Sequence, residues 1–279
     1  MQAENIDFLI IGAAKSATTW LQKALQADPS VCMPDPELHY FSRNHHLGDK
    51  WYFDHFPVSP ATRLVGEKSN SYLDTPVAPP RVHALVPHAK LIVQLRSPVA
   101  RAYSDYCMLY RRGEVGADID AHLGARAGSS SRFLNGGLYH EQILAYLDFF
   151  PKDRVLVLFY EDMLSEPREQ LRKARAFLGL ETEAIWPLPS KVKDRTAPMI
   201  PRGVRRVLAP LNPILRQVRD RPLFRSMRKV VAREVVYPAL PASVREGLVD
   251  FYAKDAAGLG SLVGRDLSKW VAGGVPSTP

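Results

Sequence analysis

The sequence has few cysteines and no long apolar run. Its two cysteines, Cys32 and Cys107, are too few for the disulfide framework of a secreted domain. The longest apolar run near the start, residues 8–14, is far shorter than the roughly 20 residues of a membrane-spanning helix. The first residues include Glu4 and Asp7 and lack the basic stretch of a signal peptide. We therefore expect no leader, no transmembrane segment and a reducing, cytoplasmic location.

Cysteine and histidine form no cluster at zinc-ligand spacing, so we expect no metal site. Hydrophobic residues at 46% and charged residues at 24% are typical of globular chains, which excludes fibrous and disordered classes. We predict a single domain over residues 1–279, a length that also fits two small domains. Within it, we interpret 187–234 as a basic lid or insertion rich in Pro and Arg, and 273–279 as a frayed tail.

The net charge of +8 is concentrated in one segment. Between Lys191 and Glu234 there are 13 Lys and Arg residues against 3 Asp and Glu, so the remainder of the chain is close to neutral. Such a segment favours an anionic partner: a phosphate-bearing cofactor, an acidic glycan, a membrane surface or nucleic acid. A solvated basic helix face without a ligand is the alternative.

Short apolar runs alternate with helical patterns along the chain. The runs predict strands at Phe8–Ile11, Arg63–Val65, Leu91–Leu95 and Val155–Phe159. Helices are predicted at Thr18–Ala27, Val99–Arg111, Leu138–Phe149, Glu166–Leu178 and through the tail from Pro241 to Trp270. Loops are predicted at Pro34–Pro36, Pro76–Pro80 and Gly128–Gly137. The alternation predicts an α/β fold, with a central parallel sheet flanked by helices.

The first predicted strand is followed by a loop of small and hydroxyl-bearing residues. From Phe8 to Trp20 the chain reads FLIIGAAKSATTW: a strand, a tight loop and the start of a helix. Backbone N–H groups at a helix N-terminus bind anions, and small residues let the backbone approach a phosphate closely. Ser16, Thr18 and Thr19 add hydroxyl donors. This loop is a candidate phosphate site.

The position of the lysine in this loop separates two chemistries. In the Walker A pattern, G-x-x-x-x-G-K-[ST], the lysine directly precedes the Mg²⁺-binding hydroxyl. Aligned from Gly12, this chain has Ala17 in place of the second glycine and Thr18 in place of the lysine, and its own Lys15 comes three residues earlier. The arrangement argues against a P-loop kinase that uses ATP and Mg²⁺, and it suits a single 5′-phosphate with the bridging oxygen beyond it.

The segment Lys15-Ser16-x-Thr18-Thr19-Trp20 resembles the 5′-phosphosulfate loop of sulfotransferases that use PAPS, 3′-phosphoadenosine 5′-phosphosulfate. The resemblance implies a P-loop-NTPase-like sulfotransferase fold, with PAPS as the co-substrate and no metal. It implies cofactor contacts from Lys15, Ser16, Ala17, Thr18, Thr19 and Trp20. Ala17 is a departure, because the family commonly has glycine at this position.

A second strand, loop and helix start follow Leu91. Arg96 ends the predicted strand, Pro98 suits the first turn of a helix, and Ser104 comes eight residues after Arg96. The resemblance makes Arg96 and Ser104 the ligands of the 3′-phosphate, and arginine offers forked donors to phosphate oxygens. Taken alone, an Arg-x-Pro sequence before a helix is also a common capping arrangement, and the phosphate role depends on the first loop as well.

Residues 36–41, PELHYF, resemble the stretch that carries the catalytic glutamate in sulfotransferases of the heparan sulfate type. The resemblance implies that Glu37 is the general base that removes the acceptor's proton. His39, two residues further in an extended segment, would point the same way and orient Glu37 or contact the acceptor. Asp35 and Pro36 stand where the family often has lysine, and Ser42 where many members have an acidic residue.

Residues 66–72, GEKSNSY, resemble the family's Glu-Lys-Ser/Thr-x-x-Tyr segment, whose lysine faces the sulfate and the acceptor. We assign this role to Lys68, with Glu67 as its orienting partner or as an alternative base. Tyr139 is a candidate neighbour of the nucleotide. The loop that closes over the cofactor in the family matches roughly 191–206, with candidates Lys193, Arg195 and Arg202.

Together these features predict a cytoplasmic enzyme that moves a sulfuryl group from PAPS to a hydroxyl, or less favourably an amine, of a saccharide, glycolipid or small natural product. An acidic acceptor or a bacterial tailoring reaction would fit. Lys15 and Lys68 would offset charge developing on the sulfuryl and leaving oxygens.

The alternatives are a small-metabolite kinase and an anion- or nucleic-acid-binding protein. We expect no nucleic acid, because Phe224 alone could stack bases in the basic segment. The oligomeric state stays open.

Overall fold

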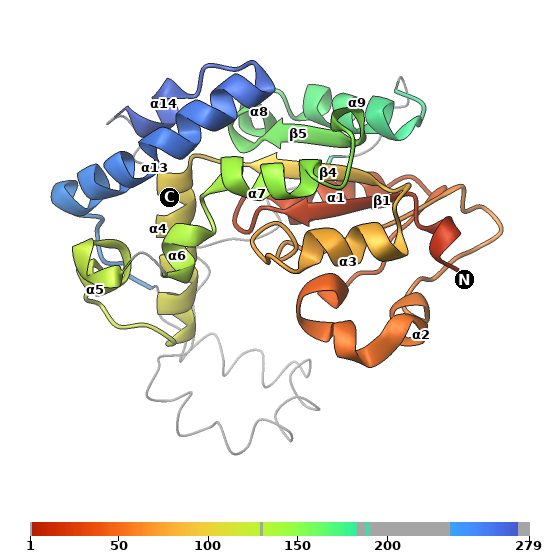
Figure 1. The fold of residues 1–279 in the computed structure, drawn as a ribbon, viewed down its shortest axis with the longest axis horizontal. Coiled ribbons are helices and arrows are strands. Elements are labelled where there is room, and N and C mark those ends of the chain that lie inside the picture. Colours follow the sequence, from red (N-terminus) through yellow and green to blue (C-terminus); the bar gives the residue numbers. More distant parts are fainter. Residues whose placement is uncertain (1, 129–130, 183–187, 190–234, 273–279) are drawn as a thin grey trace, which may run out of the picture.

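A computed structural model of the chain describes residues 2–128, 131–182, 188–189 and 235–272. Its strands are β1 (Phe8–Gly12), β2 (Val31–Cys32), β3 (Leu64–Lys68), β4 (Lys90–Leu95) and β5 (Val155–Phe159). They form one sheet in the order β2-β3-β1-β4-β5, and every neighbouring pair is parallel. The predicted fold class, a central parallel sheet flanked by helices, is confirmed (Figure 1).

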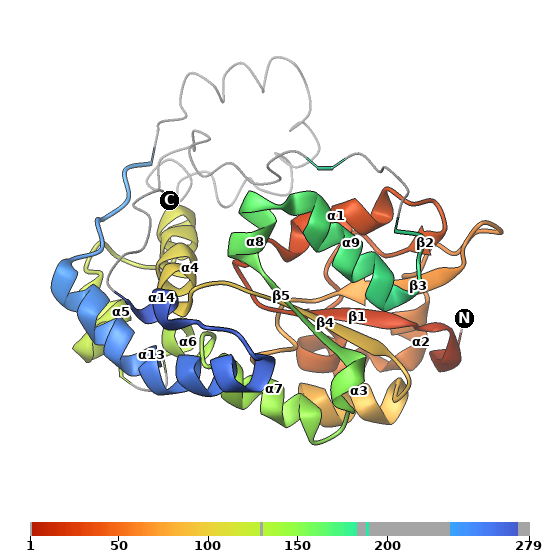
Figure 2. The ribbon, with the colours of Figure 1, turned by 90° about the horizontal axis from the view of Figure 1, so that it is seen from above.

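Alternate side chains of the central strand β1 face two different helical layers. Phe8 and Ile10 belong to the apolar cluster with α1 (Thr18–Gln26) and α9 (Pro167–Leu178). Leu9 and Ile11 pack on the other face, with α3 (Ala78–Leu85) and α7 (Tyr139–Leu147). Figure 2 shows these two layers on either side of the sheet. Because both faces are covered, the strand is a continuous apolar run without polar alternation.

A third apolar cluster lies beyond the carboxyl end of β4. It joins α4 (Pro98–Arg112), α5 (Asp120–Leu123), α6 (Arg132–Asn135) and α13 (Ala242–Val263). The short helix α14 (Ser268–Val271) brings the Trp270 ring against Tyr139 and Phe159. The other helical elements are α2 (Gly48–Phe53), α8 (Tyr160–Ser165), a π-helical turn at Tyr40–Asn44, and 3-10 turns at Ala3–Asn5, His45–Leu47, Ala125–Ala127 and Lys152–Arg154.

Several predicted boundaries were wrong. Strand β3 continues to Lys68, and the two-residue strand β2 was missed because it is too short for a periodic signal. Helix α3 begins at Ala78, inside the predicted loop Pro76–Pro80, because prolines are tolerated in a first helical turn where N–H groups need no partner. Helix α6 lies inside the predicted loop Gly128–Gly137. The tail forms two helices, since Gly264 ends α13 in a left-handed conformation.

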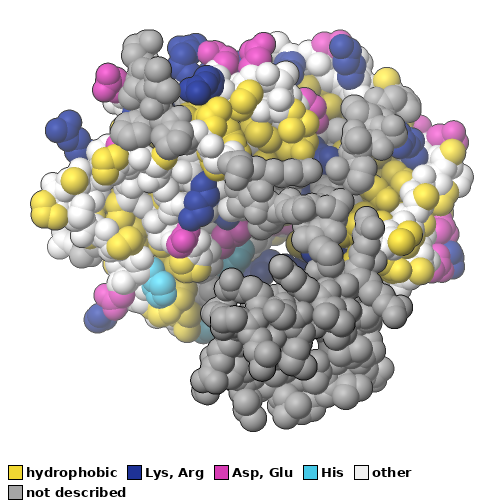
Figure 3. All heavy atoms as spheres, turned by 180° about the vertical axis from the view of Figure 1, so that it is seen from behind, with side chains coloured by type: hydrophobic (Ala, Val, Ile, Leu, Met, Phe, Trp, Pro, Cys, Tyr) yellow, Lys and Arg dark blue, Asp and Glu magenta, His cyan; other side chains and the backbone are white. Residues whose placement is uncertain are grey.

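The expected basic lid, with Lys193, Arg195 and Arg202, and the expected tail at 273–279 lie outside the described residues. On the face seen in Figure 3, Lys and Arg side chains are interspersed with Asp and Glu over the described surface. This agrees with the near-neutral balance outside the 191–234 segment. Among the described residues, none of the helices has the length and apolar character needed to cross a membrane.

Candidate active site

The candidate residues converge on the carboxyl ends of β3, β1 and β4. Strands β2 and β3 follow β1 on one side of it and β4 and β5 lie on the other side, so β1 marks the point where the strand order reverses. Ligands of open α/β sheets bind outside the carboxyl ends of strands at such a point. The loop 13–17 follows β1, and Arg96 follows β4.

The loop after β1 turns through two left-handed residues, Lys15 at φ 70° and Ala17 at φ 62°. Ala17 caps α1 and accepts the Trp20 N–H at 2.9 Å. Ser16 is fully buried, and its Oγ has no hydrogen-bond partner among the described residues. Such a buried hydroxyl, at the N-terminal end of a helix, fits an anionic oxygen.

Tyr139 carries a second hydroxyl of this kind. Its side chain is fully buried, and its hydroxyl has no hydrogen-bond partner in the described part of the chain. Burial raises the pKa of Tyr139, while Arg101 and, to a smaller extent, the neighbouring Ser16 hydroxyl act in the opposite direction. Two buried hydroxyls therefore lie near each other at the loop, as a phosphate site would need. That Tyr139 neighbours the nucleotide stays a prediction.

The loop after β4 holds Arg96 against an aromatic ring. The Arg96 guanidinium lies 4.5 Å from the centre of the Tyr160 ring at the start of α8. The next backbone N–H, that of Ser97, donates to Glu161 Oε1 at 2.9 Å. Ser104 is buried on α4. Sequence reasoning missed Tyr160, whose signal was an aromatic residue directly after a buried strand.

Glu37 is held from β3 and the residues that follow it. Its Oε1 accepts from Lys68 Nζ at 2.6 Å, and its Oε2 accepts the Asn70 N–H at 3.0 Å. The Asn70 side-chain amide also donates to Oε1 at 3.2 Å. Burial alone would raise the pKa of Glu37, but Lys68 and the Asn70 N–H outweigh it and hold the pKa below its usual value. Glu37 is therefore ionised at neutral pH. Asn70 was not among the predicted residues, although it stands in the polar run that ends β3.

His39 faces the same carboxylate. Its Nε2 lies 3.7 Å from Glu37 Oε2, and its Nδ1 lies 2.7 Å from Ser71 Oγ. The expected extended segment is wrong, because His39 is left-handed at φ 49° and begins the π-helical turn. Burial, with help from Arg43 and Lys68, lowers the pKa of His39 against the opposing effect of Glu37. The imidazole is therefore mostly neutral at neutral pH.

Lys68 connects the candidate base to the phosphate loop. Its Nζ, bonded to Glu37, also lies 3.4 Å from Thr19 Oγ1 in the first turn of α1. Neighbouring residues of a strand face opposite sides of the sheet, so Glu67 cannot share this direction. Glu67 does not orient Lys68 as expected: it accepts from Ser69 and Tyr72, and its side chain is fully buried.

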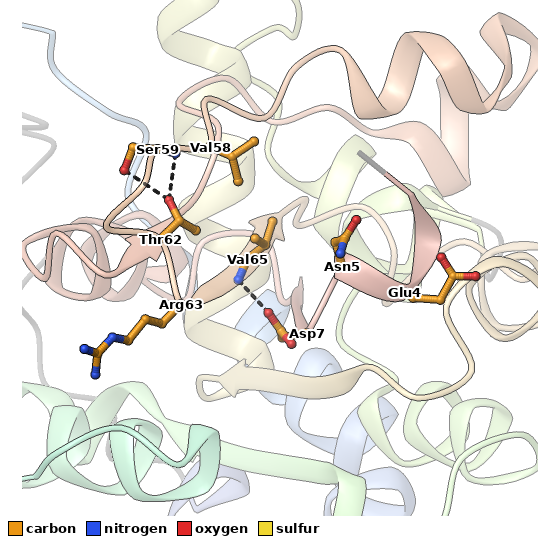
Figure 4. A pocket seen from close by; sticks show the side chains of 8 residues that line it. All are labelled: Glu4, Asn5, Asp7, Val58, Ser59, Thr62, Arg63 and Val65. Carbon is orange, nitrogen blue, oxygen red and sulfur yellow. Dashed lines mark hydrogen bonds between the residues drawn. The ribbon is translucent and has the colours of Figure 1, made fainter.

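Other candidate features lie elsewhere or are not found among the described residues. A shallow hollow at the opposite end of the sheet is lined by Glu4, Asn5, Asp7, Val58, Ser59, Thr62, Arg63 and Val65 (Figure 4). There, Asp7 accepts the Val65 N–H at 2.7 Å, which ties two strand starts together. No group of three or more His, Cys, Asp and Glu residues is placed to hold a metal ion in the described part of the chain.

The sulfotransferase domain family matches residues 5–199. The chain belongs to this family. The resemblance drawn from the sequence motifs is therefore confirmed, and the matched range of this sulfotransferase domain contains every candidate residue from Lys15 to Ser104.

Similar proteins include two named for heparan sulfate. Heparan sulfate glucosamine 3-O-sulfotransferase 3B1 of Mus musculus is 34% identical over 178 residues, which are 62% of this chain and 46% of that protein. Bifunctional heparan sulfate N-deacetylase/N-sulfotransferase 2 of Homo sapiens is 32% identical over 193 residues, 62% of this chain and 22% of that protein. This sulfotransferase domain thus spans less than half the length of either relative.

A solved structure matches over nearly the whole chain. The crystal structure of a sulfotransferase from Alicyclobacillus acidocaldarius has a TM-score of 0.71 and 26% sequence identity, over 95% of this chain and 98% of that chain. The sheet, its helical layers and the loops at the strand ends therefore form a sulfotransferase fold.

Proposed function

We propose that this chain transfers the sulfuryl group of PAPS to a hydroxyl of a saccharide. The observation that carries the proposal is the position of Lys68, whose ammonium touches both Glu37 and the Thr19 hydroxyl of the phosphate loop. A carboxylate base next to an anion-binding loop is what in-line transfer from a phosphosulfate to an alcohol requires.

The residues present suit PAPS. The buried hydroxyl of Ser16, which has no partner in the described part of the chain, and the start of α1 suit the 5′-phosphosulfate, with Lys15, Ala17, Thr18, Thr19 and Trp20 around it. Arg96 and Ser104 suit the 3′-phosphate. PAPS supplies the sulfuryl group, and the bisphosphate PAP is the leaving group.

Glu37 acts as the general base. It is ionised at neutral pH and takes the proton of the acceptor hydroxyl while the acceptor oxygen forms its bond to sulfur. Lys68 and Asn70 fix the orientation of its carboxylate. The mostly neutral imidazole of His39 is available to hydrogen-bond the acceptor. Lys15 and Lys68 offset the negative charge that develops between the acceptor and the leaving oxygen.

A saccharide acceptor is supported by the names of the relatives, one a glucosamine 3-O-sulfotransferase and one an N-sulfotransferase. An amine is the alternative acceptor group, since one relative is named as an N-sulfotransferase. An acidic saccharide or a smaller alcohol fits the same chemistry.

The first test is thermal stabilisation by PAP, with AMP and ATP/Mg²⁺ as comparison ligands. PAP at 100 times its dissociation constant should stabilise the fold by about 2.7 kcal/mol, or roughly 5–10 °C. Arg96→Ala should lose most of this shift. A shift with ATP/Mg²⁺ and none with PAP would overturn the proposal in favour of a kinase.

The second test is PAP release from PAPS with a panel of saccharide acceptors. Glu37→Gln should lower kcat about 10²- to 10⁴-fold while PAP binding is retained. Glu4→Gln, an exposed glutamate in the hollow at the opposite end of the sheet, is the matched control and should match the wild type. Full activity of Glu37→Gln would reject the base assignment.

A further inference from the structure

One buried carboxyl beside the site has no part in the reaction as described. Glu67 lies in β3, one residue before Lys68, and its side chain is fully shielded from solvent. It faces the layer that holds Tyr40, Tyr52 and Tyr72. A charged group in such a place is costly unless it is well hydrogen-bonded, so its partners indicate its role.

Two hydroxyl groups from the residues after β3 donate hydrogen bonds to Glu67, and the Tyr52 hydroxyl of α2 lies close to it. Ser69 Oγ donates to Glu67 Oε2 at 3.0 Å, and the Tyr72 hydroxyl donates to Oε1. Each hydroxyl oxygen in turn accepts a backbone N–H: that of His39 at 2.8 Å and that of Tyr40 at 2.9 Å. Two relays therefore run from one carboxyl group to two consecutive peptide groups.

Those peptide groups need partners from outside their own segment. His39 is left-handed and starts an irregular turn, so no helix or strand neighbour supplies acceptors for these N–H groups. The same segment carries Glu37 and the His39 imidazole, about 30 residues away in sequence from the relay hydroxyls. The conformation of this segment sets where both side chains point.

We propose that Glu67 is a positioning residue for sulfuryl transfer: through Ser69 and Tyr72 its carboxylate holds the backbone that presents Glu37 and His39 to the acceptor. The inference rests on the proposed function. It assigns Glu67 no contact with substrate, since its side chain is fully buried, and it replaces the alternative that Glu67 is itself the base.

The direction of the hydrogen bonds favours the ionised form. A hydroxyl has one hydrogen, and an ionised carboxylate can only accept. Both hydroxyls must therefore donate to Glu67, which leaves their oxygens oriented to accept the two N–H groups. An amide at this position presents a donor to one of the two hydroxyls and forces it to turn, and a protonated carboxyl is a weaker acceptor for one of them.

Glu67 titrates in the range where enzymes work. Burial raises the pKa of Glu67 to about 7, against the lowering effect of the Tyr72 and Ser69 hydroxyls. Five titratable groups interact electrostatically with Glu67. They are Glu37 and Lys68 at the site, Tyr72 after β3, Tyr52 of α2 and Tyr146 of α7. The three tyrosines stay neutral, because burial raises their pKa values well above the ordinary value of a tyrosine. Activity should therefore fall as the pH drops through about 7.

The test compares Glu67→Gln, Ser69→Ala and Tyr72→Phe with the wild-type chain, using PAPS and the saccharide identified in the acceptor panel. Each variant should lower kcat about 10- to 100-fold, the range expected for a misplacement of about 1 Å. The PAP-induced thermal shift should stay that of the wild type, which also shows that the variants are folded. Glu4→Gln serves as the unchanged control.

The pH profile separates positioning from loss of stability. Wild-type kcat should show an ionisation near pH 7 that is absent in Glu67→Gln and retained in His39→Gln. A wild-type kcat and an unchanged profile in Glu67→Gln would overturn the inference. Failure of the proposed function is distinguishable, because it would appear as absent PAP binding and absent turnover in the wild-type chain itself.

Discussion

Lys68 and Glu37 form an ion pair of 2.6 Å that joins the end of β3 to the segment before the π-helical turn. The Lys68 side chain is 2% exposed and that of Glu37 is 19% exposed. Removing one partner of a buried pair leaves the other charge without compensation, so this pair affects folding as well as chemistry.

Lys68→Met should destabilise the fold by about 3 kcal/mol, because the Glu37 carboxylate stays in a partly buried place without its counter-ion. It should also raise the pKa of Glu37, since Lys68 is the main group that lowers it against burial. The acid limb of kcat/KM should then move to higher pH. Urea unfolding and a pH–rate profile measure the two effects. Lys50→Met, which breaks an exposed pair with Asp54, should change neither.

Asn70→Ala should lower kcat by about tenfold with little change in PAP affinity. The substitution removes the side-chain amide bond to Glu37 Oε1 but leaves the backbone N–H bond to Oε2. One hydrogen bond to a charged group is worth about 1.5 kcal/mol, which corresponds to that factor. Steady-state kinetics and a PAP titration check it, and a large loss of PAP affinity would contradict the assignment of Asn70 to the base.

Tyr160→Leu should weaken PAP binding by roughly 3- to 30-fold, because the Arg96 guanidinium loses the ring on which it stacks at 4.5 Å. AMP lacks the 3′-phosphate and provides the internal control, since its affinity should not change. Calorimetric titration with both nucleotides gives the answer. Equal losses for PAP and AMP would show that Tyr160 supports the nucleotide in general and not Arg96 in particular.

The contribution of Glu67 to the free energy of unfolding should fall as the pH rises from about 4.5 to about 7. Its pKa is raised from 4.5 to about 7 in the fold, so the folded chain binds the proton over a range where the unfolded chain has released it. The loss is about 3 kcal/mol at most. Chemical unfolding at pH 5 and pH 8 should show a smaller difference for Glu67→Gln. An equal difference in both chains would rule out this origin.

Ala17→Gly should raise the melting temperature by about 1–3 °C. Ala17 is left-handed at φ 62°, a conformation that costs a residue with a β-carbon about 1–2 kcal/mol, partly offset by the greater freedom of glycine when unfolded. PAP binding should be kept, because the loop uses backbone groups here. The same substitution at Ala253, an exposed residue in the middle of α13, should lower stability and provides the matched comparison.

Much of the fold and part of the site followed from local pattern. The apolar run of β1 predicted a strand buried on both faces, and the loop residues after it carried the phosphate-site prediction because anion binding there depends on small residues and a helix start in sequence. The likeness of PELHYF and GEKSNSY to known segments pointed to Glu37 and Lys68. Each of these features depends on residues that are adjacent in the sequence, so the sequence alone could predict it.

What the sequence by itself determined was the fold class, the family and most of the site residues at the strand ends, without Asn70 and Tyr160. Only the tertiary structure decided how those residues pair. The left-handed backbone of His39, the turn of Lys68 away from Glu67 and toward Glu37, and the stacking of Arg96 on Tyr160 depend on segments about 30 to 65 residues apart. The physical reason is that periodicity specifies which face a side chain occupies, whereas its partner is set by the strand order and by the burial that the packed sheet imposes.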